Sequence, residues 1–405
     1  MRPVREGIWT GEVNERALAG APAFGRVRFY DTTLRDGEQT VGVVLSPEQK
    51  LAIARAVDLL GVERIEAGFP RVSADDWHAI ELIRDAGLEA EVWGFSRAVK
   101  ADVDAIVELG LAATVIESPI SDLKLDALGV TRQKMLRRIA DAVGHAASRG
   151  VRVAYFGVDG SRADLAFLEQ AYRTAAEAGA QEAVVVDTLG IASPEAAAYL
   201  VARVRDALGP AVPVHFHGHN DFGLATAAAV AAVRAGAEWI HGTINGMGER
   251  AGNASIGEVA MALTALYGAD TSIRLERIRE VSALVRELSG YALEPWKAVV
   301  GENLFVRESG AVASQFHDPP SIEPFSSALV AAERRIVLGK KSGLDSVRIK
   351  ADELGLAVPE ERRPALLEAV KKLGADKRGL VSDDEFRQLA LAHGATPAAP
   401  SHMPI

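Results

Sequence analysis

The sequence predicts an α/β protein built on a closed (β/α)8 TIM barrel, followed by a small, mainly helical C-terminal region. Three observations predict this fold. Short apolar runs alternate with longer amphipathic runs from about residue 26 to about residue 270. There are eight such apolar runs, at a spacing of roughly 30 residues. The alternating stretch also matches the ~250 residues that a barrel of this kind typically needs.

The eight predicted strands are rich in β-branched and apolar residues. They span residues 27–33, 64–69, 90–96, 113–118, 151–157, 182–188, 212–219 and 238–245. The alternative arrangement is an open, doubly wound sheet. It is less favoured because no Gly-x-Gly-x-x-Gly follows the first strand.

The predicted helices between the strands carry start and stop signals. Ser46 is a predicted N-cap, Pro47 follows it at the first helical position, and Gly61 ends the pattern. Residues 193–209 repeat the same arrangement of Ser, Pro and Gly. Such signals set helix boundaries locally, so these two helical patterns are expected to run from Ser46 to Gly61 and from Ser193 to Gly209.

The alternation also sets the expected domain boundaries. We expect an N-terminal extension over residues 1–25 and the barrel over 26–290. A linker and a small helical subdomain follow over 291–392, because Gly, Ser and Pro interrupt the chain before further helical patterns begin. The last segment, 393–405, is expected to be a disordered tail.

Composition narrows the function classes. The chain has 405 residues, a net charge of −10, 48% hydrophobic residues and no cysteine. A negative charge mixed along the chain argues against binding to nucleic acid or to a membrane surface. The lack of cysteine excludes disulfides and thiolate chemistry, so any metal would take N and O ligands. No signal peptide or membrane-spanning run is evident, and we expect a cytoplasmic enzyme acting on small molecules.

The stretch "VHFHGHND" places three histidines on one side of the seventh predicted strand. His217 and His219 come nearest the mouth of the barrel, where active sites of this fold lie, and His215 is expected in the core. Asp36 and Asn253 follow the first and eighth strands and can add oxygen ligands. Imidazole and oxygen ligands together suit Mg²⁺, Mn²⁺, Co²⁺ or Zn²⁺.

Five motifs together resemble one family, the acyl-CoA-condensing branch of the metal-dependent barrel lyases. These motifs are "DTTLRDGEQ" (31–39), "IEAGFP" (65–70), "DTLG" (187–190), "HGHNDFGLA" (217–225) and "NGMGERAGN" (245–253). The family contains isopropylmalate, citramalate and homocitrate synthases, and the resemblance covers about residues 26–345. "SPISDLKL" (118–125) and "DGSRADLAF" (159–167) look most like homocitrate synthase.

The resemblance implies a metal site and a reaction. Asp36, His217 and His219 would bind the divalent cation, with Asn253 as a further ligand or a close neighbour of the ion. The implied reaction condenses acetyl-CoA, or another acyl-CoA, with a 2-oxo acid. The family also implies a homodimer.

The same resemblance implies roles for residues at other strand ends. Arg35 would polarise the carbonyl oxygen of the 2-oxo acid, and Thr188 would bind its carboxylate. Glu66, at the end of the second strand, is expected to be a third catalytic residue beside Arg35 and Thr188. Arg97 and Ser121 are candidates for binding a second carboxylate, although a salt bridge or a helix cap would explain each equally well.

Two departures from the family pattern leave the reaction open. Val158 stands where the family has a glutamate implicated in acetyl-CoA activation, and Val312 stands where it has a histidine implicated in proton transfer. Lys341 also replaces a usual histidine. Because valine cannot take a proton, two alternatives stay open. One is a metal-dependent aldolase or lyase that acts on a 2-oxo acid without CoA, and the other is a non-catalytic metabolite-binding relative.

Overall fold

The computed structural model describes residues 6–20 and 24–398. The chain divides into two compact units. The first unit contains the described residues from Glu12 to Leu293, and the second contains residues 6–11 and the described residues from Glu294 onward. Within the described ranges, no helix combines the length and the apolar character that crossing a membrane requires.

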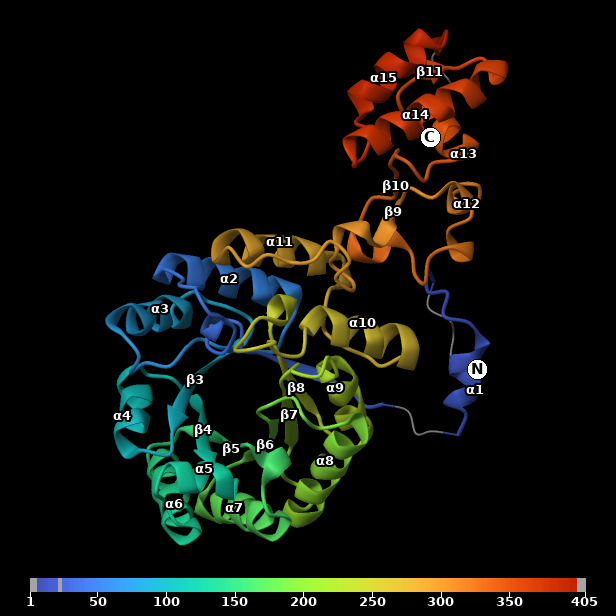
Figure 1. Ribbon diagram of the computed structural model, residues 1–405. Coiled ribbons are helices and arrows are strands. Elements are labelled where there is room, and N and C mark those ends of the chain that lie inside the picture. The colour runs from blue at the N-terminus through green and yellow to red at the C-terminus, as the bar shows by residue number, and fades with distance from the viewer. Residues whose placement is uncertain (1–5, 21–23, 399–405) are drawn as a thin grey trace. The chain divides into compact units, whose positions relative to one another are not determined.

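The first unit is a closed barrel of eight parallel strands in sequential order (Figure 1). Its strands are β1 Arg28–Asp31, β2 Arg64–Glu66, β3 Glu91–Arg97, β4 Ala113–Pro119, β5 Arg152–Val158, β6 Glu182–Asp187, β7 Val214–Gly218 and β8 Trp239–Gly242. β8 pairs with β1 and closes the barrel, with Arg28 opposite Trp239. The predicted fold class is confirmed, and the open sheet is excluded.

Helices surround the barrel (Figure 1). The first unit contains α1 Glu12–Ala17, α2 Pro47–Leu60, α3 Ala74–Arg84, α4 Lys100–Glu108, α5 Asp122–Ala127, α6 Arg132–Ser148, α7 Leu165–Ala178, α8 Pro194–Leu208, α9 Ala225–Arg234, α10 Ile256–Tyr267 and α11 Ile278–Ser289. The predicted signals act as expected on α2. The Ser46 hydroxyl accepts a hydrogen bond from the Gln49 amide, and Gly61 ends the helix with a left-handed φ of 98°.

Side chains from alternate strand positions fill the barrel interior. On β4, Ala113 and Val115 face inward, and on β5, Ala154 and Phe156 do the same. The next residue in the β4 alternation is Glu117, and the next in β5 is Val158. These two positions therefore lie at the mouth of the barrel, at the carboxyl ends of their strands.

A charged cluster occupies the opposite, amino-terminal end of the barrel. The Arg64 guanidinium donates to Glu182 through two nitrogens, at 2.5 and 2.9 Å. The guanidinium carbon of Arg64 lies 4.4 Å from the ring centroid of Trp93 and 3.7 Å from that of Trp239. The Glu182 carboxylate is also 2.8 Å from His215 Nε2. Pairing and stacking of this kind offset the cost of burying the charges.

The second unit is small and mainly helical. It contains α12 Gly310–Ala313, α13 Leu344–Glu353, α14 Arg363–Lys377 and α15 Asp383–Ala392, with the short strands β9 Val306–Arg307, β10 Arg335–Ile336, β11 Leu356–Ala357 and β12 Thr396–Pro397. Its core includes Ile336, Val347, Leu366 and Phe386, all fully buried. This unit therefore has an apolar core of its own.

The chain ends differ in part from the expected segments. Ile8 forms a bridge with Phe325, so part of the expected N-terminal extension belongs to the second unit. At the other end, β12 pairs antiparallel with β11, and residues 393–398 of the expected tail are therefore part of the second unit. The remainder of that expected tail, 399–405, lies outside the described residues.

Candidate active site

Three polar side chains converge at the mouth of the barrel. His217 Nε2 lies 3.3 Å from His219 Nε2, and Asp36 Oδ2 lies 3.3 Å from the former and 3.6 Å from the latter. All three side chains are buried. Two ligands that each lie about 2.1 Å from one ion are about 3.0 to 3.6 Å apart, for ligand–ion–ligand angles between about 90° and about 120°. The observed spacings therefore fit three ligands of a single cation.

The barrel itself brings these residues together. His217 is in β7 and His219 follows that strand directly. Asp36 lies in the turn after β1, where the Asp36 and Gly37 amides both donate to the Thr32 carbonyl. Because β8 pairs with both β1 and β7, the ends of these strands are close in space although they are far apart in sequence.

Asn253 adds an oxygen to this group. The residue forms a backbone bridge with His219. Its Nδ2 donates to the Met247 carbonyl at 3.0 Å, and its buried Oδ1 has no hydrogen-bond partner among the described residues. The loop needs glycine at position 252, where φ is +82° and an added Cβ would lie 1.9 Å from the Gly246 carbonyl oxygen.

The electrostatics keep these side chains in the forms that bind metals. Burial alone would raise the pKa of Asp36, but Arg35 and the two histidines hold that pKa well below its usual range. Burial, reinforced by the neighbouring His217, lowers the pKa of His219 to about 4. At neutral pH the site therefore offers a carboxylate, a neutral imidazole and an unpaired amide oxygen, which suit a divalent cation with N and O ligands.

Arg35 lies beside this cluster, and one nitrogen of its guanidinium has no hydrogen-bond acceptor among the described residues. Its Nε donates to Glu66 at 2.5 Å, and its guanidinium carbon lies 4.1 Å from the ring centroid of Phe95. The other oxygen of Glu66 accepts from the Tyr30 hydroxyl at 3.2 Å. Arg35 Nη2 is buried and has no partner among the described residues. The site thus contains a fixed donor available for an oxygen atom that the protein does not supply.

Thr188 lies next to the cluster, directly after β6. The pairing of Asp187 with Gly218 places Thr188 alongside His219. Its hydroxyl accepts from the Asp159 amide at 2.7 Å, which leaves the hydroxyl proton available for another acceptor.

Arg97 and Ser121 have partners within the protein. Arg97 Nε donates to Asp102 at 2.7 Å, and the Arg97 side chain is 54% exposed. Ser121 is fully buried, donates to Asp159 and caps α5 by accepting from the Lys124 amide. A role in substrate binding stays a prediction for both residues.

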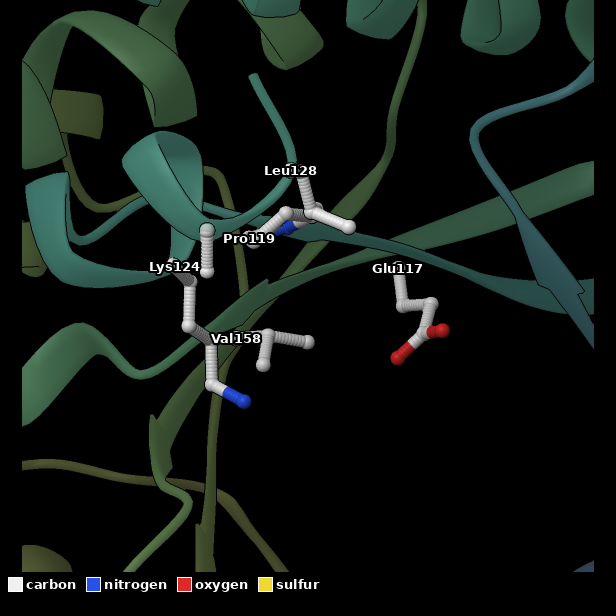
Figure 2. Close-up of a pocket in the computed structure, with 6 residues that line it drawn as sticks. Glu117, Pro119, Lys124, Leu128 and Val158 are labelled. Atoms are coloured by element: carbon white, nitrogen blue, oxygen red, sulfur yellow. The ribbon is translucent and has the colours of Figure 1, made fainter. Parts of the chain in front are cut away.

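An open pocket of about 340 Å³ lies between the ends of β4 and β5 (Figure 2). Its lining residues are Glu117, Pro119, Lys124, Ala127, Leu128 and Val158. Figure 2 shows the side chains of Glu117, Lys124 and Val158 extending into the same space. Val158 was identified from the sequence, whereas neither charged residue was assigned a role there. The inward alternation along β4 was the signal that could have placed Glu117 here.

The comparisons with known proteins agree in fold and family. A protein-family model described as HMGL-like matches residues 26–285. A homocitrate synthase of Methanopyrus kandleri is 44% identical over 89% of this chain and 90% of its own length. A 2-isopropylmalate synthase of Methanocaldococcus jannaschii is 39% identical over 93% of this chain and 74% of its own. An HMG-CoA lyase structure from Brucella melitensis, at 20% identity, superposes with a TM-score of 0.59 over 66% of this chain and 100% of its own.

Proposed function

This chain belongs to the HMGL-like family, and from that premise we propose that it condenses an acyl-CoA with a 2-oxo acid. The similar proteins named homocitrate synthase and 2-isopropylmalate synthase, which match most of the chain, support this reaction class. The observation that carries the proposal is the convergence of Asp36, His217 and His219 beside the unpaired Arg35 donor. Acetyl-CoA is the proposed donor.

In this proposal, Asp36, His217, His219 and Asn253 hold the divalent cation, which is Mg²⁺, Mn²⁺, Co²⁺ or Zn²⁺. A cation held there would supply Lewis-acid chemistry and would help to orient the 2-oxo acid. The neutral state of His219 and the ionised state of Asp36 mean that neither group must change its protonation for the cation to bind at neutral pH.

Arg35 is proposed to stabilise the charge that develops during the reaction. When an enolate carbon attacks the ketone, the ketone oxygen becomes an alkoxide. The unpaired Nη2 of Arg35 can donate to that oxygen, while Glu66 and Phe95 hold the guanidinium in place. The donor is therefore oriented before the charge appears. Thr188 is proposed to donate its hydroxyl proton to the substrate carboxylate.

A free-thiol assay tests this function. The full chain is incubated with acetyl-CoA, Mn²⁺ and each member of a panel of 2-oxo acids, and CoA release is followed spectroscopically. We expect release that requires both the metal and one particular acid. An absence of release with every acid, from protein that is folded and metal-loaded, would overturn the proposal.

A further inference from the structure

The condensation needs a group that takes a proton from the acyl donor, and a free carboxylate is the natural candidate at this barrel mouth. Most carboxylates at the carboxyl ends of the barrel strands already have partners. Asp31 accepts from Thr33, Asp36 contacts the two histidines, Glu66 accepts from Arg35, Asp159 from Arg162, Asp187 from Ser161 and Asp221 from Arg250. Each of these groups is held by the protein itself.

Glu117 is the exception. Its carboxylate has no hydrogen bond or ion pair to any residue in the described ranges. The residue pairs in register with Phe156 of β5, whose ring centroid lies 5.0 Å from that of His217. Glu117 is half-buried and lines the open pocket. Phe156 therefore lies between the two positions: it is the strand neighbour of Glu117, and its ring contacts that of the proposed metal ligand His217.

The surroundings of Glu117 suit a group that accepts a proton. Burial raises the pKa of Glu117, and Arg35 opposes that rise. Three other charged groups act on it more weakly: Glu66 from β2, Arg97 from β3 and Lys124 from α5. A carboxylate with a raised pKa is a stronger base than one in water.

We propose that Glu117 is the catalytic base of the condensation. The proposal rests on the proposed function. The Glu117 carboxylate takes a proton from the α-carbon of the acyl thioester, and the C–H electron pair passes into an enolate. The enolate carbon then forms a C–C bond with the ketone carbon of the 2-oxo acid, whose π pair becomes the alkoxide facing Arg35. Glu117 holds the proton as a carboxylic acid and returns it to that alkoxide, and water then cleaves the thioester.

Val158 supports this assignment by what it contributes to the pocket. It faces the same space as Glu117 and belongs, with Pro119, Ala127 and Leu128, to an apolar wall. An apolar wall offers the carboxylate no hydrogen-bond donor on that side. The valine at this position therefore leaves the neighbouring strand's glutamate as the proton acceptor of the pocket.

The variant Glu117→Gln tests the proposal because it preserves size and polarity but cannot take the proton. We expect kcat for CoA release to fall at least about 100-fold. The KM for the 2-oxo acid and the affinity for Mn²⁺ should stay close to wild type. The wild-type rate should rise with pH as Glu117 ionises, and the variant should lose that rise. Glu89→Gln, at an exposed position before β3 at the other end of the barrel, is the matched control and should behave as wild type.

Moving the carboxylate across the pocket gives a second test. In Glu117→Gln combined with Val158→Glu, we expect recovery of at least tenfold in kcat over Glu117→Gln alone. Equal recovery with Val158→Gln would overturn the role in proton transfer, as would a Glu117→Gln enzyme with near wild-type kcat and an unchanged pH profile. These outcomes require active wild-type enzyme, so they are distinct from failure of the proposed function, in which the wild type releases no CoA.

Discussion

Both ends of the barrel interior contain buried charges, but the two ends differ in whether these charges have hydrogen-bond partners. At the amino-terminal end, Arg64 is bonded to Glu182 through two nitrogens and stacked against two tryptophans. At the mouth, Asn253 Oδ1 and Arg35 Nη2 are buried without hydrogen-bond partners among the described residues, and Asp36 Oδ2 has only the two histidine nitrogens near it, at 3.3 and 3.6 Å. The same strands supply both ends, so the difference is one of side chains and not of fold.

This difference indicates which charges serve the fold and which serve the reaction. An unpaired buried polar group costs roughly 1–3 kcal/mol, and a protein keeps several together only where something else completes them. A bound cation and substrate would complete the mouth. Arg64 and Glu182 already bond to each other, and this pair is therefore expected to stabilise the barrel without taking part in catalysis.

The largest expected effect comes from removing a ligand at the mouth. His219→Gln should lower metal-dependent CoA release at least about 1000-fold, because the Lewis acid supplies several kcal/mol of the rate enhancement. The unfolding free energy of the metal-free protein should change by less than about 1 kcal/mol, since the mouth contributes little to the fold. Urea unfolding beside the thiol assay measures both. A large loss of stability would contradict the division between the two ends.

The opposite pattern is expected at the amino-terminal end. Arg64→Met leaves Glu182 buried without its main partner and should cost roughly 3–5 kcal/mol in unfolding free energy. The molecules that remain folded should turn over at the wild-type rate. Arg26→Met is the control, because Arg26 is 59% exposed and pairs with Glu63 at the surface, where such pairs contribute about 1 kcal/mol or less. Equal losses in the two variants would show that the buried pair is not structural.

A smaller effect is expected from Arg35→Lys. Lysine keeps the positive charge beside Glu66 but lacks the second donor that Arg35 Nη2 provides. We expect kcat to fall about 100-fold, the cost of losing one donor to a developing oxyanion. The KM for acyl-CoA should be unchanged in steady-state kinetics. A wild-type kcat would remove Arg35 from the proposed mechanism.

The smallest effect is expected at Arg97, a candidate for binding a second carboxylate. Because Asp102 already holds its guanidinium at 2.7 Å, Arg97→Gln should change the KM for the 2-oxo acid by less than about fivefold, which corresponds to about 1 kcal/mol. Steady-state kinetics measure this directly. A rise of tenfold or more would instead favour the predicted role in substrate binding.

Features with a local signal could be predicted from the sequence. Each barrel strand overlaps its predicted run, because the apolar and β-branched residues that predict a strand lie within that strand's own sequence. The helix caps at Ser46 and Gly61 are equally local. The convergence of Asp36 with His217 and His219 could be anticipated because closing the barrel brings the strand ends together.

Features that depend on distant partners could not be predicted. Arg64 and Glu182 are 118 positions apart, and no pattern in either strand identifies the other as its partner. The bridge between Ile8 and Phe325 is likewise a long-range pairing without a local signal. The free state of Glu117 is visible only when the partners of the surrounding carboxylates are known.

Metal binding by Asp36→Ala shows whether the barrel mouth is the metal site. Titration with Mn²⁺, followed by the loss of the free-ion electron paramagnetic resonance signal, should show one bound ion per wild-type chain. We expect Asp36→Ala to lower this affinity at least about 100-fold, because it removes a direct ligand, and Arg64→Met to leave the affinity unchanged. Full Mn²⁺ affinity in Asp36→Ala would contradict the assignment of the barrel mouth as the metal site.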